Sequence, residues 1–205
     1  MQITEIKKIG KGDRYYLIID EVRTFVVEAE ILARYKLKTF DEIDEDYLNK
    51  LLLDNGELAC FDRALTYLEK NIKTEKGIRD YLKQKGFLDE SVDNAVEKLI
   101  EYGYIDDSVY AENYIRTYAD KKGRKLLRFE LSIKGVDKAI IEAKLEELLD
   151  FEDEFASCKE LCKKYVKNKI VDQKLKQKAY AHLVSKGFSS DIISRVLKEE
   201  LCEVE

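Results

Sequence analysis

Three stretches decide the fold of this chain: Lys85-Gly86-Phe87, Lys134-Gly135-Val136 and Lys186-Gly187-Phe188. Their glycines lie 49 and then 52 residues apart. A tripeptide that returns at a nearly constant interval of this length is typical of a chain built from structural repeats. Each glycine is expected to end a helix in the left-handed conformation, and the hydrophobic residue after it to fold back onto the last helical turn.

Hydrophobic residues keep the same register around each glycine. A leucine stands four residues before it, and aliphatic residues follow six, ten and fourteen residues after it. In the first repeat these are Leu82, Val92, Val96 and Ile100. Steps of four predict one face of a helix, and Asp89, Asp137 or Ser189 is expected to start it. In every repeat the glycine therefore joins two antiparallel helices.

The pattern predicts a mainly α-helical fold of tandem three-helix bundles, in modules of about 50 residues. A small N-terminal β-meander with helices precedes them. The expected domains are 1–57 (the β-rich and helical region), 58–105 (module one), 106–150 (module two) and 151–205 (module three). The expected helices of the modules are 58–71, 75–85, 90–102, 107–121, 124–134, 138–149, 153–168, 172–186 and 190–201.

The first residues differ from the modules in composition. β-prone runs at 3–9, 15–19 and 24–27 are separated by the turns Gly10-Lys11-Gly12-Asp13 and Asp20-Glu21, which predicts an antiparallel meander. Helices are expected at 29–37 and 45–53, the second opened by Asp44. Asn55-Gly56 is expected to close this region.

Composition argues against several classes of protein. No apolar run approaches 18 residues and no signal peptide is evident, so we expect a soluble, cytoplasmic protein that does not enter a membrane. The four cysteines are Cys60, Cys158, Cys162 and Cys202, and the single histidine is His182. Cys158 and Cys162 stand one helical turn apart, but no further pair completes a metal site, so buried thiols are expected and no cofactor or metal.

Catalysis is not expected either. The adjacent Asp106 and Asp107 have no histidine near them in sequence, and they read as the cap of the next helix rather than as an acid/base pair. We find no phosphate-binding glycine loop and no nucleophile with a base beside it. We therefore expect a binding protein and not an enzyme.

Positive charge gathers in two strips although the net charge is −5. Residues 116–138 hold 8 basic and 3 acidic side chains, and residues 159–187 hold 9 and 2. The strips could follow a phosphate backbone or an acidic groove, or could simply be solvated helix faces. The candidate contact residues are Arg116, Lys121, Lys122, Arg124, Lys125, Arg128, Lys134, Lys163, Lys164, Lys167 and Lys174.

Gly123 lies between four of these cations at a helix junction. Its backbone N–H and those after it are expected to be open to an anion, beside the forked donors of Arg124. The tyrosines at positions 110, 114 and 118 stand at helical spacing, and they are expected to belong to the core of module two rather than to a platform for bases.

The pattern resembles the RecX family of bacterial regulatory proteins. The most specific part is Gly103-Tyr104-Ile105-Asp106-Asp107 followed by Tyr110-Ala111, and the resemblance covers roughly 59–150 and continues more loosely through module three. The other residues that carry it are Ala64, Leu65, Leu68, Ile78, Leu82, Lys85-Gly86-Phe87, Gly123, Leu127, Leu131, Lys134 and Gly135-Val136.

The resemblance implies tandem three-helix repeats and a regulator that binds the RecA recombinase in the groove of its filament on single-stranded DNA. It implies inhibition of filament growth, strand exchange and ATP hydrolysis. The family's basic face would fall on six positions of module two: Arg116, Lys121, Lys122, Arg124, Lys125 and Arg128. The expected partner is the RecA filament, with single-stranded DNA as a second candidate, and the chain is expected to be a monomer.

Two other functions stay open at this point. The modules could grip DNA directly through both strips, which predicts a steep dependence of affinity on salt. They could also form a helical adaptor for another protein, whose binding would then not need the positive charge of module two. The sequence does not decide whether the strips contact DNA or an acidic surface of RecA, or whether inhibition comes from capping or from disassembly.

Overall fold

The computed structural model describes residues 1–201. Cys202, one of the thiols expected to be buried, lies outside them. The chain forms two compact units. The first holds residues 1–72 and 78–104, and the second holds 73–77 together with everything from Ile105 onward.

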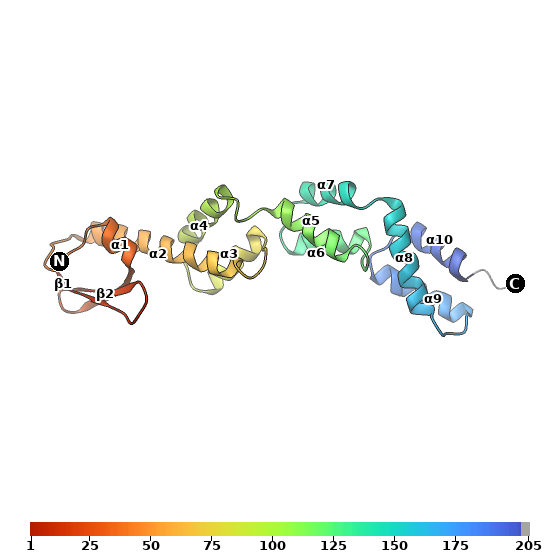
Figure 1. The fold of residues 1–205 in the computed structure, drawn as a ribbon, viewed down its shortest axis with the longest axis horizontal. Coiled ribbons are helices and arrows are strands. Elements are labelled where there is room, and N and C mark those ends of the chain that lie inside the picture. The colour runs from red at the N-terminus through yellow and green to blue at the C-terminus, as the bar shows by residue number, and fades with distance from the viewer. Residues whose placement is uncertain (202–205) are drawn as a thin grey trace. The chain divides into compact units, whose positions relative to one another are not determined.

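The first unit begins with the predicted meander. Strands β1 (Ile3–Lys8), β2 (Arg14–Ile19) and β3 (Arg23–Glu28) form an antiparallel sheet in the order β1-β2-β3 (Figure 1). Helix α1 (Ala29–Arg34) follows directly and is shorter than the expected 29–37. Alternation along the strands buries Ile3, Leu17, Ile19 and Val27 against α1 and the first half of α2.

Helix α2 (Glu45–Leu68) corrects one prediction. It begins at the expected cap, where Asp44 accepts a hydrogen bond from Tyr47 N, but it runs without a break through Asn55 and Gly56. Asn55 is tolerated there because its side chain accepts from Glu28 N at 2.8 Å and donates to Val26 O at 3.1 Å. The predicted helices 45–53 and 58–71 are therefore one helix, which serves both the sheet and module one.

Module one is completed by α3 (Glu75–Gln84) and α4 (Asp89–Glu101). Helix α4 packs on α2. The buried side chains include Cys60 and Ala64 of α2, and Leu82 and Val96 on the other two helices. The residue before α4 at the cap position is Leu88, so the prediction that Asp89 caps this helix is wrong; Asp89 lies in its first turn.

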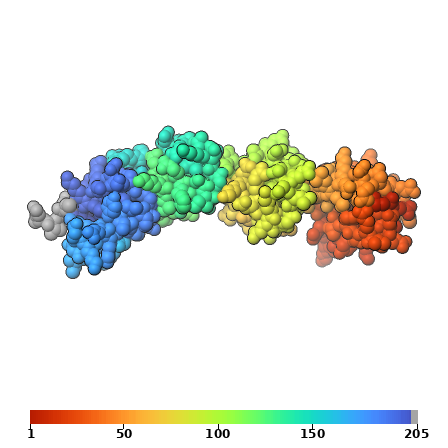
Figure 2. Space-filling model, turned by 180° about the vertical axis from the view of Figure 1, so that it is seen from behind, coloured from red at the N-terminus to blue at the C-terminus, as the bar shows by residue number. Residues whose placement is uncertain are grey.

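From Ile105 to Leu201 the second unit holds six helices. Module two consists of α5 (Asp107–Tyr118), α6 (Arg124–Ile133) and α7 (Lys138–Leu148), and module three of α8 (Phe151–Val166), α9 (Gln173–Ser185) and α10 (Ser190–Leu201). Helix α5 packs on α7, and α8 on α10. Each module buries its own core, and Figure 2 shows the green module two directly against the blue module three. The limits given above for the four domains stay a proposal.

The repeated glycines end their helices as predicted. The φ angles of Gly86, Gly135 and Gly187 are 87°, 88° and 87°. In each turn the glycine N–H bonds a carbonyl three residues back, and the next N–H reaches the leucine five residues back: Phe87 N to Leu82 O, Val136 N to Leu131 O, and Phe188 N to Leu183 O. This is the Schellman arrangement, in which a positive φ lets two otherwise unpaired helix carbonyls be satisfied.

Among residues 1–201, no helix is both long and apolar enough to cross a membrane.

Candidate functional site

The predicted anion site at Gly123 is filled by the protein itself. Gly123 N donates to Lys186 O at 2.8 Å, and Lys125 N donates to Gly187 O at 3.1 Å. Arg124 N donates to the Glu154 carboxylate of α8 at 2.9 Å. The expectation that these N–H groups are open to an anion is therefore wrong: they form a joint between modules two and three.

Glu154 supplies the negative charge that the start of α6 favours. Its side chain is 7% exposed, and its second oxygen lies 3.8 Å from Arg124 Nε. The guanidinium of Arg124 also donates to Leu149 O. A carboxylate at a helix N-terminus satisfies otherwise unpaired N–H groups and interacts favourably with the helix dipole. Arg124 is thereby committed to the joint.

Glycine is required in this joint for space as well as for conformation. A Cβ at Gly123 would lie 2.6 Å from the backbone of Gly187, and a Cβ at Gly187 would overlap the backbone of Leu126. The turn of module three and the first turn of α6 therefore meet backbone to backbone.

The same joint occurs a second time within the second unit, between residues 73–77 and module two. Thr74 Oγ1 donates to Lys134 O at 2.8 Å, and Lys76 Nζ donates to Ile133 O at 3.0 Å. Glu75 N donates to Asp107 Oδ1 at 2.9 Å. The start of a module's second helix thus binds the lysine-glycine turn of the following module and a carboxylate of that module's first helix.

Asp107 and Glu154 are equivalent positions of the repeat. They lie four residues before Ala111 and Cys158, which are fully buried at matching places in α5 and α8. The matching position in module one, four residues before the buried Ala64, is Cys60. The carboxylate is therefore present in both modules whose turn is used in a joint.

Asp107 offers a test of what the joint requires. The pKa of Asp107 is raised, and burial of its carboxyl group is the main cause. The hydrogen bond from Glu75 N lowers this pKa, whereas the nearby charges of Glu75 and Asp106 raise it further. Because the pKa of Asp107 is higher in the folded than in the unfolded state, its contribution to stability falls as the pH rises from the unfolded-state pKa to the folded-state pKa. Asn keeps the oxygen acceptor without the charge.

We therefore expect Asp107→Asn to keep most of the wild-type free energy of unfolding at neutral pH. Asp107→Ala leaves Glu75 N without its partner and should be less stable than Asp107→Asn by about 1–2 kcal/mol. Urea unfolding of both variants measures the difference. Equal losses in the two variants would show that the charge, and not the hydrogen bond, holds this joint.

Several predicted contact residues of module two are held by internal partners. Lys122 is 20% exposed, and its ammonium lies 2.6 Å from Glu130 and 4.2 Å from the centre of the Tyr118 ring. Arg128 forms a forked pair with Glu142 through bonds of 2.5 and 2.7 Å. These side chains stabilise the module, and a ligand would have to compete with their partners.

The remaining cations of that strip are more accessible. Arg116 pairs with Glu112 one helical turn away at 3.0 Å, and Lys121 lies 3.5 Å from Asp120; all of these groups are largely solvated except Glu112. Lys125 is exposed, and Lys134 lies 5.5 Å from the centre of the Tyr114 ring. Exposed pairs of this kind contribute little energy and can open to a ligand.

The tyrosine stripe belongs to the core of module two, as predicted. Tyr110, Tyr114 and Tyr118 pack against the buried cluster of that module. The Tyr114 hydroxyl donates to Glu130 at 2.7 Å. Burial, together with this bond and the charge of Glu130, raises the pKa of Tyr114 well above its ordinary value.

Module three carries cations with fewer partners. Lys163 lies 3.8 Å from Glu160 and 3.9 Å from Glu200. Lys164, Lys167 and Lys174 are exposed, and within residues 1–201 no ion pair involves them. Among the described residues of the second unit, cations without an ion-pair partner are therefore more numerous on module three, although the family resemblance places the basic face on module two.

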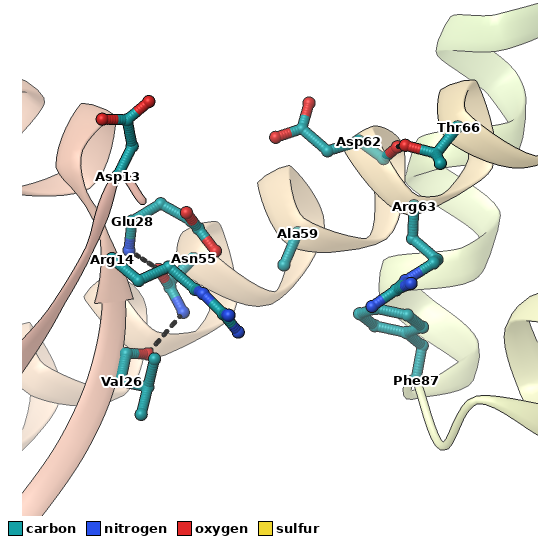
Figure 3. A pocket seen from close by; sticks show the side chains of 10 residues that line it. All are labelled: Asp13, Arg14, Val26, Glu28, Asn55, Ala59, Asp62, Arg63, Thr66 and Phe87. Carbon is teal, nitrogen blue, oxygen red and sulfur yellow. Dashed lines mark hydrogen bonds between the residues drawn. The ribbon is translucent and has the colours of Figure 1, made fainter. Parts of the chain in front are cut away.

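The first unit has a polar pocket that the sequence did not indicate. It has a volume of about 510 Å³ and lies between the sheet, α2 and the Phe87 turn (Figure 3). Arg14 and Arg63 extend toward its centre from opposite sides. Burial raises the pKa of Glu28 and of Asp62, which also line it. Its charges nearly balance, so it does not favour a ligand of either sign.

The thiols of the described residues are buried, as predicted for Cys60, Cys158 and Cys162. Burial raises the pKa of Cys60 to about 11 and that of Cys158 to about 12, which keeps both thiols protonated. Within residues 1–201 no group of three His, Cys, Asp or Glu side chains is arranged to hold a metal ion.

Three family models match successive parts of the chain. They describe the first, second and third three-helix domains of RecX, and they match residues 60–99, 106–145 and 152–197.

Relatives of known name match nearly the whole chain. A protein named "Regulatory protein RecX" from Clostridium botulinum (strain Alaska E43 / Type E3) is 33% identical over 201 residues, covering 96% of this chain and 94% of the relative. One of the same name from Clostridium beijerinckii is 35% identical over 199 residues, covering 95% and 92%.

Two solved structures are similar as well. The "Crystal structure of regulatory protein RecX" superposes with a TM-score of 0.75 at 27% identity and covers 97% of this chain and 99% of that one. The "Crystal structure of RecX from Lactobacillus salivarius" gives a TM-score of 0.65 at 29% identity, covering 71% of this chain and 97% of that one.

Proposed function

This chain belongs to the RecX family of regulatory proteins, and on that premise we propose that it modulates the RecA recombinase by binding the RecA filament on single-stranded DNA. It lowers ATP hydrolysis by the filament and slows filament growth and strand exchange. Its role is regulatory, and binding rather than catalysis produces the effect.

The observation that best supports this proposal is the repeated joint. Similar modules follow one another, and the joint between α6 and module three fixes those two modules through backbone hydrogen bonds and a buried carboxylate. Two similar surfaces held at a fixed interval suit a partner that is itself a polymer of identical subunits.

The contact surface in this proposal is the set of eleven basic residues in the two strips. Cations without an internal partner, such as Lys125, Lys164 and Lys167, should contribute most, because they lose no existing bond when a ligand arrives. Lys122, Arg124 and Arg128 should contribute mainly through the shape of the modules.

The test is the RecA ATPase on single-stranded DNA. We expect the chain to lower the rate at substoichiometric amounts and to slow strand exchange in parallel. A protein with Lys164, Lys167 and Lys174 changed to alanine should inhibit less, and one with only Lys36, Lys38 and Lys50 changed should inhibit fully. Unchanged ATPase and strand exchange at a one-to-one ratio would reject the proposed function.

A second candidate function is direct binding of DNA by the modules. The exposed and unpaired lysines of module three favour it. A fluorescence anisotropy titration without RecA separates the two functions, because direct binding requires an affinity for naked DNA that falls steeply with salt.

A further inference from the structure

Helix α9 carries four basic positions on one line. Lys174, Lys178, His182 and Lys186 stand four residues apart, the last at the C-cap of the helix. Residues at this spacing share one helix face and lie about 6 Å apart along its axis. Lys174 and Lys178 are exposed, while His182 and Lys186 are half-buried. Within residues 1–201 no carboxylate forms an ion pair with any side chain of this α9 line.

The equivalent line in module two carries one carboxylate, which pairs with one of its two lysines. Counting back from Gly135 as from Gly187, its members are Lys122, Leu126, Glu130 and Lys134. Lys122 and Glu130 form an ion pair of 2.6 Å. His182 of module three thus occupies the place of Glu130, and Lys178 that of Leu126. The same face has changed from internally paired to positive.

The surroundings of His182 disfavour the charged form of its imidazole. Tyr165 of α8 stacks on its ring with centroids 4.4 Å apart, and Lys169, after α8, lies 3.8 Å from the centre of the Tyr165 ring. Burial, and then the charges of Lys186 and Lys169, lower the pKa of His182. Within residues 1–201 no carboxylate forms a hydrogen bond or ion pair with the imidazole, and the charges that shift its pKa are those of the two lysines. An anion bound on the line would favour the imidazolium.

A phosphodiester backbone suits this line better than an acidic protein surface does. A nucleic-acid strand offers negative charges at a regular interval along one direction, as the line offers positive ones. The Tyr165 ring already stacks on the His182 ring and contacts Lys169. We therefore expect the lysines to contact phosphates, and not the rings to stack on bases. The choice of single-stranded DNA rests on the proposed function, in which the filament carries that nucleic acid.

We propose that the α9 line binds the phosphate backbone of single-stranded DNA and that His182 takes up one proton from water when it does. The lysines supply the attraction, and the proton adds a fourth positive charge to the line. Binding is therefore tighter at low pH, because the protonated imidazole is favoured in the complex and disfavoured in the free protein.

The test uses the full chain and labelled oligothymidylate, without RecA. Changing Lys174, Lys178 and Lys186 to glutamine should lower the affinity at least tenfold and reduce the slope of log affinity against log salt by about 2, since each phosphate contact to a single strand contributes about 0.7. The matched control changes the exposed Lys36, Lys38 and Lys50 to glutamine. It removes the same charge from outside the two basic strips, and we expect a much smaller loss.

Proton uptake is measured on the single histidine of the chain. We expect the NMR titration of the His182 imidazole to move to higher pH when oligothymidylate is added, and the affinity at about pH 6 to exceed that at about pH 8 severalfold. His182→Gln should bind with an affinity that no longer changes over this range. The wild-type titration tests the idea even where a variant is unstable.

The alternatives have distinct outcomes. Equal losses for the two triple variants, or an unchanged His182 titration, would overturn the proposal. The proposal would also be overturned if the Lys174, Lys178 and Lys186 variant no longer bound DNA-free RecA but still bound oligothymidylate. That result would assign the line to an acidic protein surface. Because RecA is absent from the main measurement, failure here leaves the proposed effect on the RecA ATPase to be judged by its own experiment.

Discussion

Replacing Gly187 by alanine is expected to lower the free energy of unfolding of module three by about 3–5 kcal/mol, whereas the same change at Gly86 should lower that of module one by about 1–2 kcal/mol. Both glycines have a φ of 87°, so the left-handed conformation is equally unfavourable for alanine at either. The difference lies in their surroundings. A Cβ at Gly86 meets nothing within 4 Å, and a Cβ at Gly187 overlaps the backbone of Leu126.

The extra loss at Gly187 comes from the joint. To admit the methyl group, the start of α6 must move, which strains the bonds from Gly123 N to Lys186 O and from Lys125 N to Gly187 O. Urea unfolding compares the two variants. Amide hydrogen exchange at Gly123 and Lys125 shows whether the loss is local, which matters because a chain of several cores need not unfold in one step. Equal effects of the two substitutions would mean that the joint contributes nothing.

Removing the Glu154 carboxylate should have the second largest effect. Glu154→Ala leaves Arg124 N without an acceptor and part of the Arg124 charge without its partner in a buried place. We expect the free energy of unfolding to fall by about 2–3 kcal/mol, somewhat below the loss for a fully buried pair because Arg124 is partly solvated.

The matched control is Glu152→Ala, in the same first turn of α8 but exposed. Its effect should stay within about 0.5 kcal/mol. Glu154→Gln should fall between the two, since the amide oxygen still accepts from Arg124 N. Thermal unfolding ranks the three proteins. A loss for Glu154→Ala no larger than for Glu152→Ala would contradict the role given to this carboxylate.

The repeat and its turns were predictable because they depend on local chemistry. Positive φ, a leucine one turn earlier and a hydrophobic residue after the glycine define a Schellman turn within six residues, and all three turns formed as predicted. The sheet was predictable for the same reason, from alternating residues separated by short turns.

What failed depended on contacts between distant residues. Asn55-Gly56 is a turn signal, but the Asn55 side chain accepts a hydrogen bond from Glu28 N and donates one to Val26 O, both in β3, which makes it compatible with a continuous helix. Gly123 looked like an anion site because the sequence does not reveal that Lys186, Gly187 and Glu154 would occupy its N–H groups. The sequence did contain a signal for the joint, namely acidic residues at the equivalent positions 107 and 154. That signal becomes visible only when the repeats are aligned with one another.

Charge patterning had the same limitation. The sequence places Lys122 and Arg128 in a strip of excess positive charge, and the structure pairs them with Glu130 and Glu142. The count of charges was right, but which charges remain available depends on packing. Module three is the better supplied with unpaired lysines, although the family resemblance pointed to the basic face of module two.

Modules two and three carry a carboxylate at the joint position, Asp107 and Glu154, whereas module one has Cys60 there. Module one can therefore precede another module in such a joint but cannot follow one. Consider a duplicated copy of residues 106–150 placed between modules two and three. Its Asp107 could accept a hydrogen bond from the start of the second helix in the preceding module. Its own second helix, which begins after Gly123, could bind the turn of the following module. The row can therefore lengthen from within by gene duplication. A module placed ahead of the first would meet a thiol where its helix start needs an acceptor, and would first require an acidic residue there.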